Sequence, residues 1–401
     1  MNLFKSTLII ILSLMLTNCT NNDDKLKARA NELAQKFIIT DGHIDLPWRL
    51  HKNGYEDISV RTPGGDFDYV RAKQGGLDAP FMSIYVPATY QVTGGAKEMA
   101  LELMNSVKRI TTDHPDKFEM AYSISDVERI FNEGKIALPM GMENGAPIEG
   151  DLDNIQFFFD EGIRYITLTH SEDNDICDSS YNLGERTHKG LSDFGKEVVL
   201  EMNRVGIMVD ISHVSDDAFY QIMDVTQVPA IASHSSARHF TPGFERNMSD
   251  DMIKRLAENG GVIQINFGSS FVTQESQNKR KKNSEDVSAF AKENNLESDD
   301  PIVKEFAKKV AIDNPVFCDV TDVADHFDHV VKLVGIDHVA FGSDYDGVGD
   351  TLPYGLKDAS TFPNLIYHLL KRGYSEEDIE KICYKNIWRV WKATEEFAKL
   401  N

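Results

Sequence analysis

Several short apolar runs in this sequence end in side chains that bind metal ions or transfer protons. In chain order, these ends are Asp41-Gly42-His43-Ile44-Asp45, Met142-Glu143, Thr169-His170, Ser212-His213, Ser233-His234 and Ser343-Asp344. If the runs are the parallel strands of a (β/α)8 barrel, their carboxyl ends meet at one face, where such barrels assemble their active sites. Imidazoles and carboxylates that converge in this way predict a hydrolase with two metal ions.

The first and last of these runs supply one candidate metal site. His43 and Asp45 lie two positions apart on one strand, so their side chains point to the same face of the sheet. Asp344 ends the last run and is placed to complete this site. Glu143 ends a run between the two groups of ligands, and we expect its carboxylate to bridge the two ions.

His213 and His234 end neighbouring runs and supply the second candidate site. Mixed imidazole and carboxylate ligands suit zinc best, although manganese, cobalt and iron also accept them. Two such ions about 3.5–4 Å apart hold a bridging hydroxide as the nucleophile and polarise a carbonyl oxygen. His170 also ends a run but is surplus to both metal sites, so we expect it to be a further functional group.

The spacing of the apolar runs predicts the barrel itself. Each run is nearly continuous, as in parallel strands that are buried on both faces, and an amphipathic helix separates most of them. Strands are expected near Phe37–Asp45, Phe81–Val86, Ile136–Glu143, Ile163–His170, Gly206–His213, Val228–His234, Gly261–Phe267 and Val339–Asp344. Helices are expected at Gly95–Thr111, Asp153–Glu161, Gly195–Arg204, Asp216–Asp224, Asp250–Glu258 and Val320–Val334. Eight strands favour closure into one α/β barrel of the TIM type.

Two stretches interrupt this alternation. Asn53–Gly76 predicts a long loop after the first strand, and the highly polar stretch Gln274–Asn314 predicts an insertion with two helical pieces after the seventh. We interpret the basic run Asn278–Lys282 in this insertion as a solvated loop. His326 and His329 also have metal-ligand spacing, but they lie on a peripheral helix without an evident third ligand. We interpret them as surface residues.

Residues 1–18 resemble the signal peptide of a bacterial lipoprotein. Their apolar segment, Leu8–Leu16, is too short for a lasting membrane span. The run Leu16-Thr17-Asn18-Cys19 makes Cys19 the expected lipidated first residue. Asn18 is an unusual neighbour for such a cysteine, so cleavage nearby without lipid is the alternative. In either case we expect an exported protein, located in the envelope of a bacterium and anchored to a membrane if Cys19 carries lipid.

Composition narrows the function classes. The 401 residues are 41% hydrophobic, which is enough for a large core, and we expect a linker and helix over residues 19–36 followed by one barrel domain over residues 37–401. The net charge of −22 argues against nucleic acid and against an anionic membrane surface as partners. Membrane contact is therefore expected through the lipid anchor only. Beyond Cys19, three cysteines remain without a Cys-x-x-Cys pattern, so we expect buried thiols: Cys177, Cys318 and Cys383.

With these motifs identified, the chain resembles the membrane (renal) dipeptidase family, peptidase family M19, over roughly residues 37–398. Eight segments, in family order and spacing, carry the resemblance: Asp41–Pro47, Gly141–Gly145, Leu168–Ser171, Gly190–Gly195, Asp210–Ser215, Ser233–Ala237, Arg246–Asn247 and Phe341–Val348.

The resemblance implies a zinc-dependent dipeptidase that hydrolyses the peptide bond of small dipeptides with a metal-bridging hydroxide. Two Zn2+ ions are implied, one on His43, Asp45 and Glu143 with Asp344 nearby, the other on Glu143, His213 and His234. In this scheme Asp344 takes the proton of the attacking water and passes it to the leaving amine. His170 contacts the developing oxyanion, and Arg246 binds the carboxylate of the substrate.

Three positions depart from the family pattern. Ile44 replaces a common asparagine, but it points away from the two metal ligands that flank it. Phe271 stands where a tyrosine would contact the substrate carboxylate, which leaves the preferred dipeptide open. A loop cysteine of the family is absent, and Glu172 occupies that region. Since family members often dimerise, a homodimer is a further expectation.

Two other classes of protein remain open at this point. Another amidohydrolase, such as a lactonase, a phosphotriesterase or a dihydroorotase-like enzyme, would share the barrel. Many of those enzymes use a carbamylated lysine as the bridge, whereas Glu143 and His170 occupy the corresponding strand ends here. A solute-binding lipoprotein would share the signal and the acidic surface, but it would have two lobes and would need no cluster of metal ligands.

Overall fold

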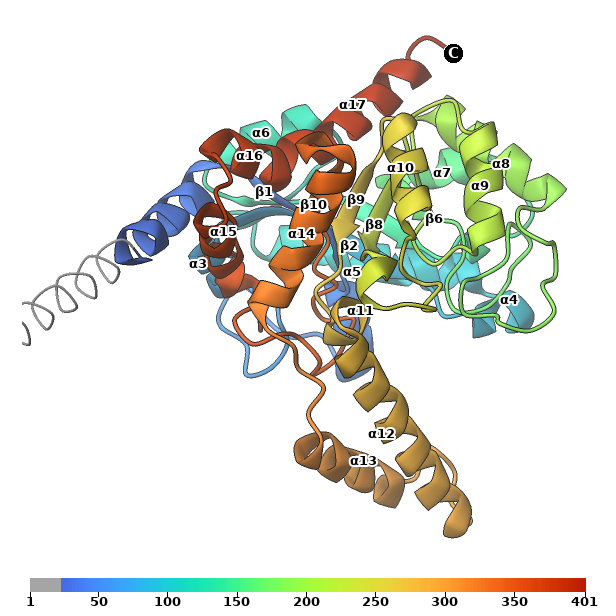
Figure 1. Ribbon diagram of the computed structural model, residues 1–401. Coiled ribbons are helices and arrows are strands. Elements are labelled where there is room, and N and C mark those ends of the chain that lie inside the picture. The colour runs from blue at the N-terminus through green and yellow to red at the C-terminus, as the bar shows by residue number, and fades with distance from the viewer. Residues whose placement is uncertain (1–22) are drawn as a thin grey trace, which may run out of the picture.

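Eight parallel strands close into a barrel at the centre of the molecule (Figure 1). The computed structural model describes residues 23–401, so the expected signal peptide and Cys19 lie outside the described residues. In sequence order, the barrel strands are β1 (Ile39–Ile44), β2 (Leu77–Tyr85), β5 (Met140–Glu143), β6 (Ile163–Thr167), β7 (Met208–Asp210), β8 (Ile231–Ser235), β9 (Val262–Ile265) and β10 (Val339–Phe341). Pairing of Asp41 with Phe341 joins the first strand to the last. The predicted (β/α)8 architecture is confirmed.

One predicted strand is in fact two. The stretch expected at Ile136–Glu143 divides into β4 (Ile136–Leu138) and the barrel strand β5. Pro139 lies between the two pieces and has no backbone N–H to continue a ladder. β4 pairs instead with β3 (Phe118–Met120) in a separate two-stranded sheet. Only the second piece therefore reaches the barrel and presents Glu143.

Helices connect the strands and cover the barrel. Those before the insertion are a helix over residues 23–36, α2 (Leu46–Asn53), α3 (Tyr69–Gly75), α4 (Thr89–Thr93), α5 (Ala96–Asp113), α6 (Ile124–Asn132), α7 (Asp153–Glu161), α8 (Asp193–Val205), α9 (Asp216–Val225), α10 (Asp250–Glu258) and α11 (Ser269–Val272). Those after it are α14 (Val320–Val334), α15 (Phe362–Lys371), α16 (Glu376–Glu380) and α17 (Asn386–Ala398). The predicted bounds of α7, α10 and α14 are confirmed to the residue.

Serine caps fix where several of these helices begin. Ser192, Ser215 and Ser249 each accept a hydrogen bond from the backbone N–H three residues later, at the start of α8, α9 and α10. The long loop expected over Asn53–Gly76 is partly wrong, because α3 (Tyr69–Gly75) occupies its last part. That helix begins where the side chain of Asp68 accepts from the backbone N–H of Arg71.

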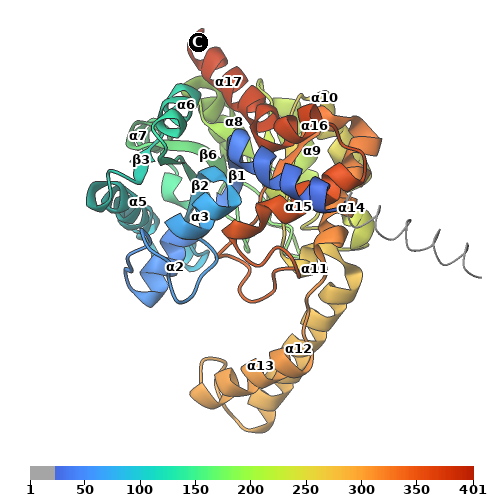
Figure 2. The ribbon, with the colours of Figure 1, turned by 90° about the vertical axis from the view of Figure 1, so that its left-hand side faces the viewer.

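The insertion after β9 is a pair of helices that stands away from the barrel (Figures 1 and 2). α12 (Gln274–Glu293) and α13 (Pro301–Asp313) correspond to the two predicted helical pieces. The interpretation of Asn278–Lys282 as a loop is wrong, because these residues lie inside α12. Lysine and arginine are good helix formers, and Thr273 caps the helix by accepting from the backbone N–H of Ser276.

A column of aromatic rings fills the barrel from its closed end up to the site. The ring centroids of Trp391 and Phe81 are 5.2 Å apart, and those of Phe81 and Tyr165 are 5.3 Å apart. Gly141 is required beside Tyr165, because a Cβ there would lie 2.0 Å from its ring. The Tyr165 hydroxyl ends the column 2.8 Å from Nδ1 of His43. The aromatic column therefore connects α17, through Trp391, with the predicted metal ligand His43.

Two further expectations concern cysteines and membranes. Cys177, Cys318 and Cys383 are free and buried, as predicted. Within residues 23–401, no helix has the length and apolar character needed to cross a membrane.

Candidate metal centre

Glu143 lies at the centre of the predicted site. Its Oε2 is 3.4 Å from Nε2 of His43. Its Oε1 is 3.0 Å from Nε2 of His213 and 3.3 Å from Nε2 of His234. The two carboxylate oxygens thus face two different groups of imidazoles, which is the arrangement that a bridging ligand needs.

The two aspartates approach the site from the side of His43. Asp45 Oδ2 is 3.5 Å from Nε2 of His43, and each of His43, Asp45 and Asp344 offers a ligand atom within 4.8 Å of the others. Gly347 makes room for this group. A Cβ at Gly347 would lie 2.1 Å from Oδ2 of Asp45 and 2.2 Å from Oδ1 of Asp344, so a larger residue would displace both carboxylates.

The ligand atoms fit divalent metal ions in number, chemistry and spacing. Nε2 of His43 and Oδ1 of Asp45 are buried without a hydrogen-bond partner among the described residues, a costly arrangement unless a ligand satisfies them. Ligands about 2.0–2.1 Å from a tetrahedral zinc ion lie about 3.3 Å from one another. The separations of 3.0–3.5 Å around Glu143 and His43 match this value.

Two of the predicted ligands have unusual backbone conformations. His213 has a φ of 70° and Asp344 a φ of 61°, in the left-handed region that residues with a Cβ rarely adopt. Such strain concentrates at functional sites. It also explains why the predicted strands were too long, since the chain leaves the ladder before it reaches these residues: β7 ends at Asp210 and β10 at Phe341.

Two histidines are oriented by hydrogen bonds on the ring nitrogen that faces away from the site. The Tyr165 hydroxyl lies 2.8 Å from Nδ1 of His43, and the Ser233 hydroxyl lies 2.7 Å from Nδ1 of His234. Contacts of this kind fix the ring orientation and direct Nε2 into the site.

The carboxyl groups of the site differ in proton affinity. Burial raises the pKa of Asp344 to about 8, and the charges of Asp45 and Glu143 act in the same direction. Burial also opposes the ionisation of Glu143, but the nearby imidazoles, that of His43 first, hold its pKa well below the usual value. Asn266 Nδ2 donates to Oδ2 of Asp344 at 2.7 Å and fixes its orientation. One carboxylate can thus remain ionised while its neighbour exchanges a proton.

The structure places His170 and Arg246 next to the predicted ligands. His170 Nε2 is 3.6 Å from Oε1 of Glu143, and its side chain is 20% exposed. Its position admits a metal ligand as well as a substrate contact. Arg246 is buried, and its guanidinium donates to Oγ of Ser235 at 2.6 Å and to the carbonyl oxygen of His234 at 2.8 Å.

A cavity of about 590 Å3 opens at the predicted ligands. Its lining residues are Asp45, Trp48, Tyr85, Glu143, His170, Ser171, Glu172, Tyr181, His213, His234, Phe271, Arg280, Asp344, Gly347 and Val348. Sequence reasoning missed four of the larger ones. Tyr85 could have been found, because it follows a predicted strand to its carboxyl end. Trp48, Tyr181 and Arg280 lie on a helix, a loop and the insertion, where periodicity does not indicate which residues face the site.

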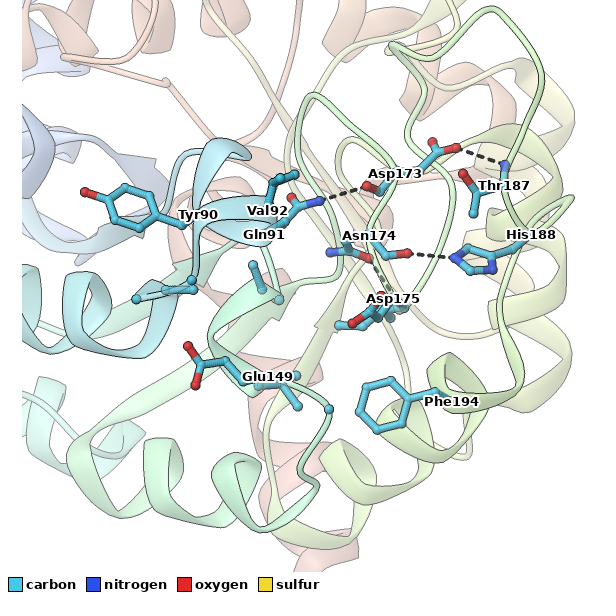
Figure 3. A pocket seen from close by; sticks show the side chains of 18 of the residues that line it. Tyr90, Gln91, Val92, Glu149, Asp173, Asn174, Asp175, Thr187, His188 and Phe194 are labelled. Carbon is cyan, nitrogen blue, oxygen red and sulfur yellow. Dashed lines mark hydrogen bonds between the residues drawn. The ribbon is translucent and has the colours of Figure 1, made fainter.

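The loop that carries Tyr181 is tied to the rim of the barrel. Gln91 Nε2 donates to the carbonyl oxygen of Asp173 at 2.8 Å, and the backbone N–H of Thr187 donates to Oδ2 of the same aspartate at 3.1 Å. Figure 3 shows these contacts around a second hollow, of about 680 Å3, which the loop borders. Hydrogen bonds on the outer side of the loop thus hold in place a segment that lines the central cavity.

The interpretation of His326 as a surface residue is wrong. It is fully buried. Its Nδ1 accepts from the backbone N–H of Ala237 at 3.0 Å, and its Nε2 lies 2.9 Å from the carbonyl oxygen of Val272. His329 is half-buried and lies 2.7 Å from Oδ1 of Asp250. The two histidines thus make separate contacts, His326 with two backbone groups and His329 with the carboxylate of Asp250, rather than sharing one site.

A closed parallel barrel with imidazoles and carboxylates gathered at the carboxyl ends of its strands defines a metal-dependent hydrolase of the amidohydrolase type. The family model described as membrane dipeptidase (peptidase family M19) matches residues 27–401. The chain therefore belongs to peptidase family M19, and it is a metallo-dipeptidase. This result confirms the resemblance and decides against a solute-binding protein, which would have two lobes.

Relatives from animals, fungi and bacteria show the same relationship. The chain is 30% identical over 382 residues to mouse dipeptidase 3, with 94% of this chain and 68% of that protein covered. It is 32% identical over 384 residues to the uncharacterized dipeptidase C965.12 of Schizosaccharomyces pombe, with 92% and 83% covered. Among solved structures, the probable dipeptidase PvdM from Pseudomonas aeruginosa superposes with a TM-score of 0.80 at 27% identity, covering 94% of this chain and all of that one.

Proposed function

We propose that this protein is a zinc-dependent dipeptidase that holds two Zn2+ ions and cleaves the single peptide bond of small dipeptides. The observation that carries the proposal is the position of Glu143, whose two oxygens face separate groups of imidazoles. When bound, the two ions supply a bridging hydroxide as nucleophile and polarise the scissile carbonyl. His43, Asp45 and Glu143 would hold one ion with Asp344 nearby. Glu143, His213 and His234 would hold the other.

Asp344 is the residue we assign to proton transfer. Its carboxyl group is buried beside Asp45, and burial raises its pKa to about 8, so both its protonated and its ionised forms are accessible near neutral pH. The same group can accept a proton and then donate it to the leaving amine, since the product nitrogen must be protonated before it departs. Asn266 holds one oxygen of Asp344 by its 2.7 Å hydrogen bond, which leaves the other oxygen to exchange the proton.

Arg246 explains why the substrate would be a dipeptide. Its guanidinium contacts the backbone of the ligand His234 and lies over the Phe271 ring, with 5.5 Å between the guanidinium carbon and the ring centroid. A guanidinium pairs best with a carboxylate. A free carboxylate one residue beyond the scissile bond satisfies this arginine, whereas a longer peptide would place a neutral amide there.

Replacing Glu143 with glutamine tests the metal site. A glutamine amide keeps the size of the side chain but cannot bridge two cations with two anionic oxygens. We expect Glu143→Gln to lower the bound metal from two equivalents and to abolish dipeptide hydrolysis, as measured by plasma mass spectrometry and by ninhydrin assay. Glu149→Gln, on the surface nearby in the sequence, is the control and should retain both. Two bound ions with full activity in Glu143→Gln would refute the bridging role.

A dipeptide and its carboxyl-terminal amide test the assignment of Arg246. A hydrogen bond to a charged group contributes about 1.5–3 kcal/mol, so amidation should lower kcat/KM by roughly 10–150-fold. In Arg246→Ala most of this discrimination should disappear. If the wild-type enzyme cleaves both compounds at equal rates, the carboxylate is not recognised and the restriction to dipeptides is wrong.

A further inference from the structure

The inserted helix α12 brings one arginine to the catalytic cavity. Arg280 lines the same cavity as the ligands Glu143, His234 and Asp344, although the rest of α12 extends away from the barrel (Figure 2). Its Nη1 donates to Oγ of Ser270 at 2.9 Å. This hydrogen bond connects Arg280 with the short helix α11. Most of the guanidinium N–H groups remain available to other partners.

Unlike Lys279 and Lys282 on the same helix, Arg280 has no acidic partner among the described residues. Lys279 pairs with Glu275 at 2.8 Å, and Lys282 pairs with Asp286 at 2.9 Å. Among residues 23–401, no carboxylate lies within salt-bridge distance of Arg280. In a chain with 64 acidic and 42 basic residues, a guanidinium without a carboxylate at the edge of a substrate cavity is available to bind an anion.

Arg280 lines the cavity, and Arg246 lies buried next to Phe271 of the same wall. Arg246 lies over the ring of Phe271, and Arg280 is bonded to Ser270, the residue before it. The two arginines are therefore close to one region of the cavity.

One carboxylate of the substrate needs only one of the two guanidinium groups, that of Arg246 or that of Arg280. Under the proposed function, on which this inference rests, Arg246 binds the main-chain carboxylate at the end of the dipeptide. A second guanidinium on the same wall matches a second carboxylate on the same substrate residue, because each guanidinium can form a two-pronged pair with one carboxylate. Only aspartate and glutamate carry such a group on the side chain.

We propose that Arg280 forms a subsite for the side-chain carboxylate of the second residue, so that the enzyme prefers dipeptides ending in aspartate or glutamate. The insertion thus supplies a specificity residue that the barrel strands do not. Neutral second residues still bind through Arg246 but leave Arg280 without an anionic partner.

Matched substrates test this subsite in the zinc-loaded enzyme. Alanyl-aspartate and alanyl-asparagine have nearly the same shape and differ by one charge, and alanyl-glutamate and alanyl-glutamine form a second pair. We expect kcat/KM to be roughly 10–150-fold higher for the acidic member of a pair. Arg280→Gln should remove most of this ratio by lowering the value for the acidic substrate, and should leave the neutral substrate within about threefold of wild type.

Lys281→Gln provides the matched control, since it removes the same charge one residue further along α12, from an exposed side chain that does not line the cavity. It should leave the ratio unchanged. Equal rates on both members of a pair in the wild type, or an unchanged ratio in Arg280→Gln, would overturn the subsite while leaving the dipeptidase function intact.

Binding of the free amino acid products separates the two proposals. By calorimetry, L-aspartate should bind the zinc-loaded wild type more tightly than L-asparagine, and Arg280→Gln should remove the difference. If no dipeptide is hydrolysed, the proposed function fails, and this binding comparison still decides the subsite. Equal affinity for the two amino acids would overturn it.

Discussion

Four imidazoles surround one buried carboxylate in this protein, and they do not have equivalent surroundings. His43, His213 and His234 are buried and lie within 3.4 Å of Glu143. His170 is slightly further away and partly exposed to the cavity. Its ring packs against Tyr85 on the cavity wall, with 4.7 Å between centroids. The difference suits three residues that hold metal ions and one that meets the substrate.

His170→Asn tests this division of roles. Burial lowers the pKa of His170, so the neutral ring can donate one hydrogen bond to a developing oxyanion. An asparagine would lose the position of that donor without removing a carboxylate or an imidazole that binds metal. We expect two bound ions to be retained while kcat falls by roughly 10²–10³-fold. Metal analysis with steady-state kinetics is the measurement, and a loss of one equivalent of metal would show that His170 is a ligand instead.

A helix on the outside of the barrel can position residues of the site through contacts that lie far from the predicted metal ligands. α14 lies on the outside of the barrel, but its buried His326 joins two loops of the catalytic face. It accepts from the backbone N–H of Ala237 after β8 and lies against the carbonyl oxygen of Val272 at the end of α11. Arg246 follows the first of these positions and Phe271 precedes the second. His326 thus connects both segments that border the proposed carboxylate site.

The stability of the protein should depend on the protonation of His326. Burial lowers its pKa from 6.5 to about 4, so the folded state keeps the ring neutral where the unfolded chain already binds a proton. The stabilisation that depends on a neutral His326 is fully present above pH 6.5. It is lost as the pH falls through 4, and the free energy of unfolding decreases by up to about 1.4 kcal/mol per pH unit. His326→Gln should be less stable at pH 7.5 and should lose less stability on acidification. Urea unfolding at several pH values measures both, with exposed His51→Gln as the control. Parallel curves for wild type and His326→Gln would contradict the assignment.

The elements themselves were largely predictable from sequence. Continuous apolar runs identify buried parallel strands, and the serine caps at Ser192, Ser215 and Ser249 mark helix starts. The candidate metal ligands were identified for the same reason, since a polar residue that ends such a run lies at the carboxyl face of a barrel. His213 and Asp344 show the limit, because their left-handed backbone depends on the site they form and not on local propensity.

Contacts between distant segments were not predictable in this way. Arg280 sits in a polar helix whose hydrophobic pattern is weak, and its place in the cavity depends on how α12 leaves the barrel. His326 resembles a metal ligand by its spacing from His329, yet backbone groups far away in sequence satisfy it. In both cases the deciding partner, Ser270 or Ala237, lies on another element, and a single sequence does not contain that pairing.

At the scale of the whole molecule, the negative net charge determines how the protein can contact a membrane. The net charge of −22 would repel an anionic membrane surface, and residues 23–401 include no helix suited to span a bilayer. A homodimer remains a prediction.

We propose that the protein is exported and held in the bacterial envelope by lipid on Cys19. Only a few residues separate Cys19 from the helix that begins at residue 23, a reach of about 14 Å when fully extended. Such an anchor would keep the barrel close to the membrane.

Cys19→Ala tests whether lipid is the sole attachment. Each buried methylene contributes about 0.8 kcal/mol to membrane binding, and within residues 23–401 no helix could span a membrane in place of the lipid. The variant should therefore move from the membrane fraction to the soluble fraction or remain unprocessed, with its dipeptidase activity unchanged once the protein is purified. Asn18→Ala places a small residue before the cysteine and should stay membrane-bound. Intact-mass analysis of the wild type checks the chemistry directly, because an amino terminus other than Cys19 without an acyl mass would rule out the anchor, and the barrel would then be a freely diffusing enzyme of the envelope.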